Sequence, residues 1–124
     1  MNRPCLVVLL ALCACTEKKP LALKPGDLAK GADEFKTRCA LCHGMTGAGN
    51  GPMAGSLAVK PRNLAAPMWQ VTETDAALDE IITKGGKAVG KSELMPANFQ
   101  DDPQGLANVR AYIRSLLSGP GHGN

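Results

Sequence analysis

Aromatic residues and blocks of like charge are both scarce in this sequence. Of its 124 residues, the aromatic ones are Phe35, Trp69, Phe99 and Tyr112. Four rings supply little of the buried apolar surface that the core of an ordinary soluble domain requires. The formal net charge is only +3, and lysine and arginine form no block beside a row of aromatic side chains. We therefore expect one domain with an unusual core, and no nucleic-acid binding.

Cysteines are missing from most of the chain. Three of the five lie within the first 15 residues, and the remaining two are Cys39 and Cys42. This distribution excludes a framework of spaced disulfides. A disulfide between those two residues would close a very short loop and would stabilise the fold little.

The first 14 residues have the features of a signal peptide. Arg3 gives the start a positive charge, and an unbroken apolar run, LVVLLALCA, follows at residues 6–14. That run is too short to span a bilayer. The sequence LCAC at residues 12–15 resembles a bacterial lipobox. The resemblance implies cleavage before Cys15, lipidation of that cysteine, and an anchor at the periplasmic face of a bacterial membrane. An ordinary secretory signal cleaved nearby is the alternative.

The segment after the signal is predicted to be a tether. Residues 15–26 contain two prolines and three lysines and show little periodicity, which is typical of a flexible linker. Residues 119–124 are predicted to be a flexible tail. Residues 27–118 are then left as the folded domain.

Three main helices are predicted in this domain. Their ranges are 28–42, 75–84 and 103–118, and each follows a residue suited to cap a helix. Apolar residues recur in them at helical spacing, and no stretch alternates like a strand, so the fold class is all-α. Residues 44–63 contain five glycines and two prolines, which predicts a loop with room for one helical turn at 53–57. Long loops are unusual in a small domain; a cofactor enclosed by them would order them and complete the core.

The chemistry of the domain is indicated by Cys39-Ala40-Leu41-Cys42-His43, the C-x-x-C-H pattern of covalent haem attachment. Thiols three residues apart at a helix end lie on one side and can bond to the two vinyl groups of one porphyrin. The imidazole of His43 projects toward the same centre and can bind the iron. A redox dithiol usually sits in a βαβ unit, which is absent here. A zinc site would need a fourth ligand, and the one remaining histidine is His122 in the terminal GHGN. We therefore expect one covalently bound haem c.

The candidates for a ligand on the opposite face of the haem are Met45, Met53, Met68, Met95 and His122. The first is only two residues past His43, and the next two fit better as residues that fill gaps in a core. Met95 lies 52 residues after His43, and Pro96 restricts it to an extended conformation that presents its side chain. Met95 is favoured on this reasoning, with another residue or an open iron site as alternatives.

Taken together, these features resemble the class I cytochrome c family over residues 27 to about 118. The matching features are Gly31 and Phe35, the CALCH motif, the GNGP loop, the MPANF run and the YIRSL ending. The resemblance implies a cytochrome c fold in which the first and last helices cross at Gly31 and Tyr112. It also implies that Met95 is the distal iron ligand.

The resemblance further implies roles for three residues around the haem. The carbonyl of Pro52 would accept a hydrogen bond from Nδ1 of His43 and so orient the imidazole. Arg62 and Trp69 are candidates to donate to the haem propionates. Trp69 is also consistent with a role in the core alone.

Imidazole and thioether ligands would leave the iron six-coordinate and low-spin, with no site for a substrate. The expected function is therefore outer-sphere transfer of single electrons between redox proteins, by a monomer or a subunit of a respiratory complex, and not catalysis. Lys84, Lys87 and Lys91 either attract an acidic partner to the haem edge or form an ordinary solvated loop. An iron left open would instead allow gas binding or peroxidase-like chemistry. An electron-entry subunit of a larger redox enzyme is the other alternative.

Overall fold

The computed structural model describes residues 23–118, which form helices joined by loops without any strand, as the all-α prediction requires. The helices are α1 (Leu28–Arg38), α2 (Ala40–His43), α3 (Pro67–Thr72), α4 (Asp75–Lys84) and α5 (Pro103–Ser115). Three 3-10 turns accompany them: η1 (Ala54–Ser56), η2 (Lys87–Val89) and η3 (Leu116–Ser118). Over this range, none of the helices has the length and apolar character needed to cross a bilayer. The signal peptide, Cys15, most of the tether and the tail at 119–124 lie outside the described residues.

The three predicted helices are present, and their caps explain where they begin. The carboxylate of Asp27 accepts hydrogen bonds from the first turn of α1, and Asp102 does the same for α5. Thr74 caps α4, which ends at Gly85 in the left-handed region with a φ of 78°. The first helix is shorter than predicted, because the chain turns at Cys39 before α2 continues. The helical turn expected at 53–57 corresponds to η1, whereas α3 and η2 were not predicted.

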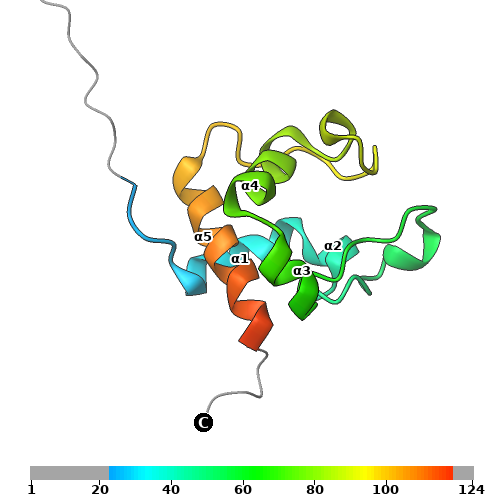
Figure 1. The fold of residues 1–124 in the computed structure, drawn as a ribbon, viewed down its shortest axis with the longest axis horizontal. Coiled ribbons are helices and arrows are strands. Elements are labelled where there is room, and N and C mark those ends of the chain that lie inside the picture. The colour runs from blue at the N-terminus through cyan, green and yellow to red at the C-terminus, as the bar shows by residue number, and fades with distance from the viewer. Residues whose placement is uncertain (1–22, 119–124) are drawn as a thin grey trace, which may run out of the picture.

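The close crossing of α1 and α5 organises the fold (Figure 1). Gly31 faces the backbone of α5, and a Cβ there would collide with the carbonyl oxygen of Asn108 and lie 2.9 Å from the Cβ of Tyr112. The rings of Phe35 and Tyr112 pack beside this crossing with centroids 5.2 Å apart. Val109 is fully buried between the helices. The predicted crossing at Gly31 and Tyr112 is therefore confirmed.

The end of the predicted tether is attached to α5. The backbone N–H of Lys24 donates to the side chain of Gln104 over 2.9 Å, and the Gln104 amide donates back to the Lys24 carbonyl. Gly26 lies so close to Ala107 that a Cβ would collide with its carbonyl oxygen. The N–H of Asp27 donates to the side chain of Asn108 over 2.9 Å. Lys24 and Gly26, both in the predicted tether, thus contact α5 directly.

Two arginines of α5 hold α3 and α4 against it. The guanidinium of Arg114 donates to the carbonyl of Glu73 at 2.6 Å and to Asp75 at 2.9 Å. One turn earlier, Arg110 pairs with Asp79, whose pKa is raised because burial outweighs the attraction of that arginine. This network fixes the position of α3 although the helix has only six residues.

The tight crossing at Gly31 generates the first prediction. Gly31→Ala places a methyl group against the Asn108 carbonyl, so we expect a loss of about 1–3 kcal/mol in the free energy of unfolding. Thermal unfolding followed by circular dichroism measures the change. Gly55→Ala is the matched control, because a Cβ at position 55 meets nothing within 4 Å. Equal melting temperatures for the two variants would contradict the proposed crossing.

Candidate functional site

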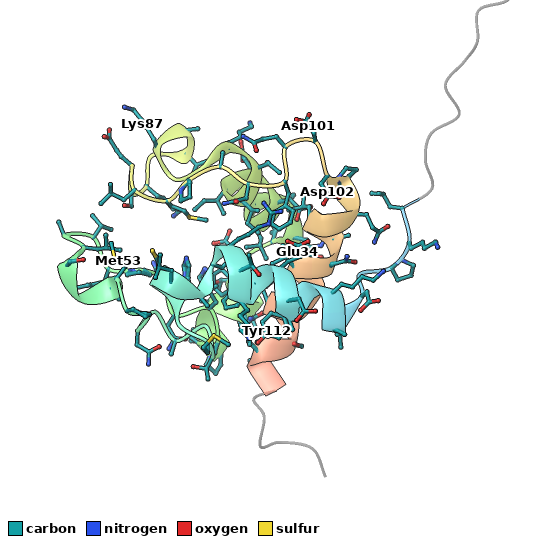
Figure 2. The ribbon with its side chains drawn as sticks, turned by 180° about the vertical axis from the view of Figure 1, so that it is seen from behind. Glu34, Met53, Lys87, Asp101, Asp102 and Tyr112 are labelled. Carbon is teal, nitrogen blue, oxygen red and sulfur yellow. The ribbon has the colours of Figure 1, made fainter. Side chains whose placement is uncertain are left out.

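A cavity of about 840 Å³ lies between the helices and the two long loops. Its volume falls in the range of sites that bind cofactors and other sizeable ligands. The loops that carry η1 and η2 extend toward the same side of the molecule (Figure 1). Met53 and Lys87 mark these two loops at that side (Figure 2). The cavity lining includes Cys39, Cys42 and His43, together with Met95 from the loop after α4.

Cys39 and Cys42 both line the cavity and are not joined by a disulfide. The N–H groups of Cys42 and His43 both donate to the carbonyl of Cys39, at 3.2 and 2.9 Å. This single turn brings all three side chains to the cavity lining. Burial raises the pKa of the Cys39 thiol to about 11, an effect larger than the opposing attraction of Arg38. An unmodified Cys39 thiol would therefore stay protonated at neutral pH, unlike the reactive thiolate of a redox dithiol.

The imidazole of His43 is oriented by a backbone carbonyl. Its Nδ1 lies 3.0 Å from the carbonyl oxygen of Arg62. Because a carbonyl can only accept, Nδ1 carries the proton and Nε2 keeps a lone pair for a metal. Burial lowers the pKa of His43, which keeps the ring neutral. A neutral imidazole fixed through one nitrogen is the form that binds a metal through the other.

The assignment of this carbonyl to Pro52 is corrected by the structure. On either side of Pro52, the N–H of Gly51 donates to Cys42 and the N–H of Met53 donates to Leu41, each at 3.0 Å. These bonds fold the segment back onto α2. Pro52 is consequently exposed and lines a separate open hollow on the surface, away from the cavity that His43 faces. The chain returns to His43 only later, at Arg62.

Met95 is brought to the cavity by a loop that two backbone bonds attach to α4 and its end. The N–H of Gly86 donates to the carbonyl of Met95 over 2.9 Å, and that of Asn98 donates to Ile82 over 2.8 Å. Met95 itself is half-buried and packs against the core. These contacts hold its side chain at the cavity wall.

Other described methionines do not take part in this wall. Met45, Met53 and Met68 are 58, 44 and 73% exposed, and none of them lines the cavity. The interpretation of Met53 and Met68 as core residues is therefore wrong, because both face solvent. His122 lies outside the described residues.

Arg62 and Trp69 both line the cavity, as a role beside the cofactor would require. Trp69 projects from α3 and is half-buried, with the Arg114 guanidinium 5.9 Å from the centre of its ring. Arg62 is exposed at the rim. The structure adds Arg38 and Lys60 to the positive groups of the lining, and neither was predicted there.

The three lysines of the loop region differ in their surroundings. Lys84 pairs with Glu80 at 2.8 Å, and Lys87 pairs with Glu93 at 3.3 Å. These pairs are exposed and weak. Of the three lysines, only Lys91 lines the cavity. Of these three candidates for attracting an acidic partner, the structure therefore places one, Lys91, at the cavity.

Known proteins resemble this chain over most of the folded domain. The sequence model of the cytochrome c family matches residues 28–117. The chain belongs to the cytochrome c family. It is also 33% identical over 94 residues to the cbb3-type cytochrome c oxidase subunit FixP of Bradyrhizobium diazoefficiens. The match covers 75% of this chain and 29% of that relative, so the chain spans less than a third of its length.

Membership of this family makes the protein an electron-transfer protein with covalently bound haem c. The residues present fit that group. Two free thiols and a neutral, oriented imidazole share one wall, and the rest of the lining includes apolar side chains such as Leu64, Leu78 and Ile81. A haem bound in this cavity would supply the buried apolar surface that the four aromatic residues alone do not provide.

Covalent attachment can be tested at each thiol. In Cys39→Ala and Cys42→Ala we expect one thioether bond to remain, so haem stays on the chain during denaturing electrophoresis. The double variant should lose essentially all its haem to acidified acetone, because the iron ligands do not survive denaturation. Leu41→Ala, in the same motif, is the control and should retain the haem. Haem that stays attached to the double variant would contradict the assignment.

Proposed function

We propose that this protein carries single electrons on one haem c whose iron is bound by His43 and Met95. The main observation that supports this proposal is that, among the described methionines, Met95 alone lines the cavity that His43 lines. The attachment of its loop to α4 supports the same assignment. When bound, haem iron cycles between its ferric and ferrous states and so takes up or releases one electron.

The protein's own residues would keep the structural change that accompanies electron transfer small. The Arg62 carbonyl holds the proton of His43 on Nδ1 and fixes the plane of the ring. Backbone hydrogen bonds hold the loop that carries Met95 in place, and these bonds do not involve the haem. Both ligands are neutral and preorganised, so neither needs to move or exchange a proton when one electron enters or leaves. An open iron site for gas binding or peroxidase-like chemistry would require the Met95 side chain to leave the cavity lining.

A second role is favoured by the relative whose name describes a subunit of a cbb3-type cytochrome c oxidase. We propose that this haem domain passes electrons to a larger redox enzyme, as a fixed subunit or as a carrier that docks to it. Purification from native membranes in mild detergent distinguishes the two. Co-migration with a larger haem complex supports the fixed subunit, and migration alone supports the free carrier.

The location follows from the signal and lipobox residues. We propose that the chain is exported, cleaved before Cys15 and lipidated there, which places the haem domain at the periplasmic face of a membrane. The LCAC sequence at residues 12–15 supports this proposal.

The ligand assignment generates a direct prediction. Met95→Ala should convert the ferric haem from low-spin to high-spin and lower its reduction potential, because the sulfur that favours Fe(II) is lost. We expect a fall on the order of 0.1 V, a fraction of the range that axial ligands span. Optical spectra and a redox titration measure both changes. Met53→Ala, an exposed methionine, should leave both unchanged. A low-spin Met95→Ala variant with the wild-type potential would refute the assignment.

The membrane anchor is tested at Cys15. Cys15→Ser removes the thiol that would be acylated, so we expect most of the protein to move from the membrane fraction to the soluble periplasmic fraction. Cys13→Ser is the control, because residue 13 lies within the predicted signal peptide. The anchor would be disproved by Cys15→Ser protein that stays with the membranes after a salt wash.

A further inference from the structure

A contact between Arg38 and Phe99 joins the two sides of the haem cavity. Arg38 is the last residue of α1 and directly precedes Cys39, whereas Phe99 lies four residues after Met95. The Arg38 guanidinium lies 4.8 Å from the centre of the Phe99 ring, a cation–π distance. Glu34, one turn back on α1, holds the guanidinium through a 2.8 Å ion pair. Figure 2 shows Glu34 on α1 and, at Asp101 and Asp102, the end of the loop that leads into α5.

The backbone at Phe99 is built to present this ring. Its φ is 58°, and within residues 23–118 it is the one residue other than glycine with a positive φ. A bulky residue rarely adopts this conformation, and such residues persist only where their surroundings enforce it. The ring is 6% exposed, and Gly105 makes room for it, since a Cβ there would lie 2.8 Å from the ring. Folding thus turns the ring inward to the end of α1.

We propose that Arg38 and Phe99 form a strap that holds the Met95 loop closed over the haem, so that both act as positioning residues for Met95. This inference rests on the proposed function, in which Met95 binds the iron. The backbone bonds of Met95 and Asn98 attach the loop to α4 and the turn after it. The strap attaches the loop to the end of α1, which leads directly into Cys39. The contact between Arg38 and Phe99 therefore fixes the loop that carries Met95 relative to the segment that carries Cys39 and Cys42. The bonds to α4 do not do this.

The strap predicts how readily an added ligand replaces Met95. Exogenous imidazole binds the ferric iron only in molecules whose Met95 loop has opened, so its apparent affinity is proportional to the open fraction. Loss of an exposed cation–π contact should raise that affinity about two- to five-fold. Arg38 is suited to this test because its side chain is 45% exposed and its replacement leaves the core intact.

The experiment titrates the full-length, haem-loaded ferric protein with imidazole and follows the loss of the iron–methionine absorption band. The variants are Arg38→Gln, Phe99→Leu and the double variant. We expect both single variants to raise the affinity, Phe99→Leu by the same factor or more because it also loses packing. In the Phe99→Leu background, Arg38→Gln should add nothing, because the contact has already gone. Lys36→Gln, which removes the same charge two residues away on α1, should leave the affinity unchanged.

The outcomes separate the strap from the ligand assignment. The strap is overturned if Arg38→Gln leaves the affinity unchanged, or raises it equally with and without the Phe99 ring. If Phe99→Leu does not accumulate, Arg38→Gln against Lys36→Gln decides the question alone. Met95→Ala should bind imidazole more tightly than any strap variant, since nothing competes. A Met95→Ala protein with wild-type imidazole affinity would instead refute the proposed function.

Discussion

The close contact between α1 and α5 at Gly31 determines where the haem-attachment motif and the loop of Met95 lie on the two sides of the cavity. Because position 31 has no side chain, the two helices approach until their backbones touch, with Phe35 and Tyr112 packed alongside. The helix α1 leads directly into the thiols, and α5 begins where the methionine loop ends. Helices are stiff over this length, so one contact sets the positions of the attachment motif and of the distal loop together.

The remaining supports act on the loops and on the short helix α3. The Arg62 carbonyl returns the η1 loop to His43, and the Arg114 network fixes α3 and with it Trp69. Backbone bonds to α4 hold Met95. The Arg114 contacts join residues about forty positions apart in the chain, and the others join residues closer in sequence. A chain with few aromatic residues can complete its apolar core with the cofactor, and the apolar side chains that line the cavity suit this arrangement.

The sequence could predict the features that depend on local pattern. Caps and periodicity predicted α4 and α5, and the C-x-x-C-H spacing predicted the wall that carries Cys39 and His43. Met95 was identified from its distance along the chain and from Pro96, and the structure brings it to the same cavity. The helix α3 was missed because six residues are too few for a periodic signal, and its buried Gln70 is held by carbonyls of distant residues. Tertiary contacts also decided the break at Cys39, the replacement of Pro52 by Arg62, and the turn at Phe99, and none of these has a local signature.

The central claim is that one iron is held between His43 and Met95 and changes oxidation state by one electron. A redox titration of the purified haem-loaded protein, followed by its optical spectrum, tests this claim most directly. The account predicts one haem per chain, a single one-electron transition, and low-spin spectra in both the ferric and the ferrous state. A high-spin ferric spectrum, or a ferrous form that binds carbon monoxide rapidly, would contradict it.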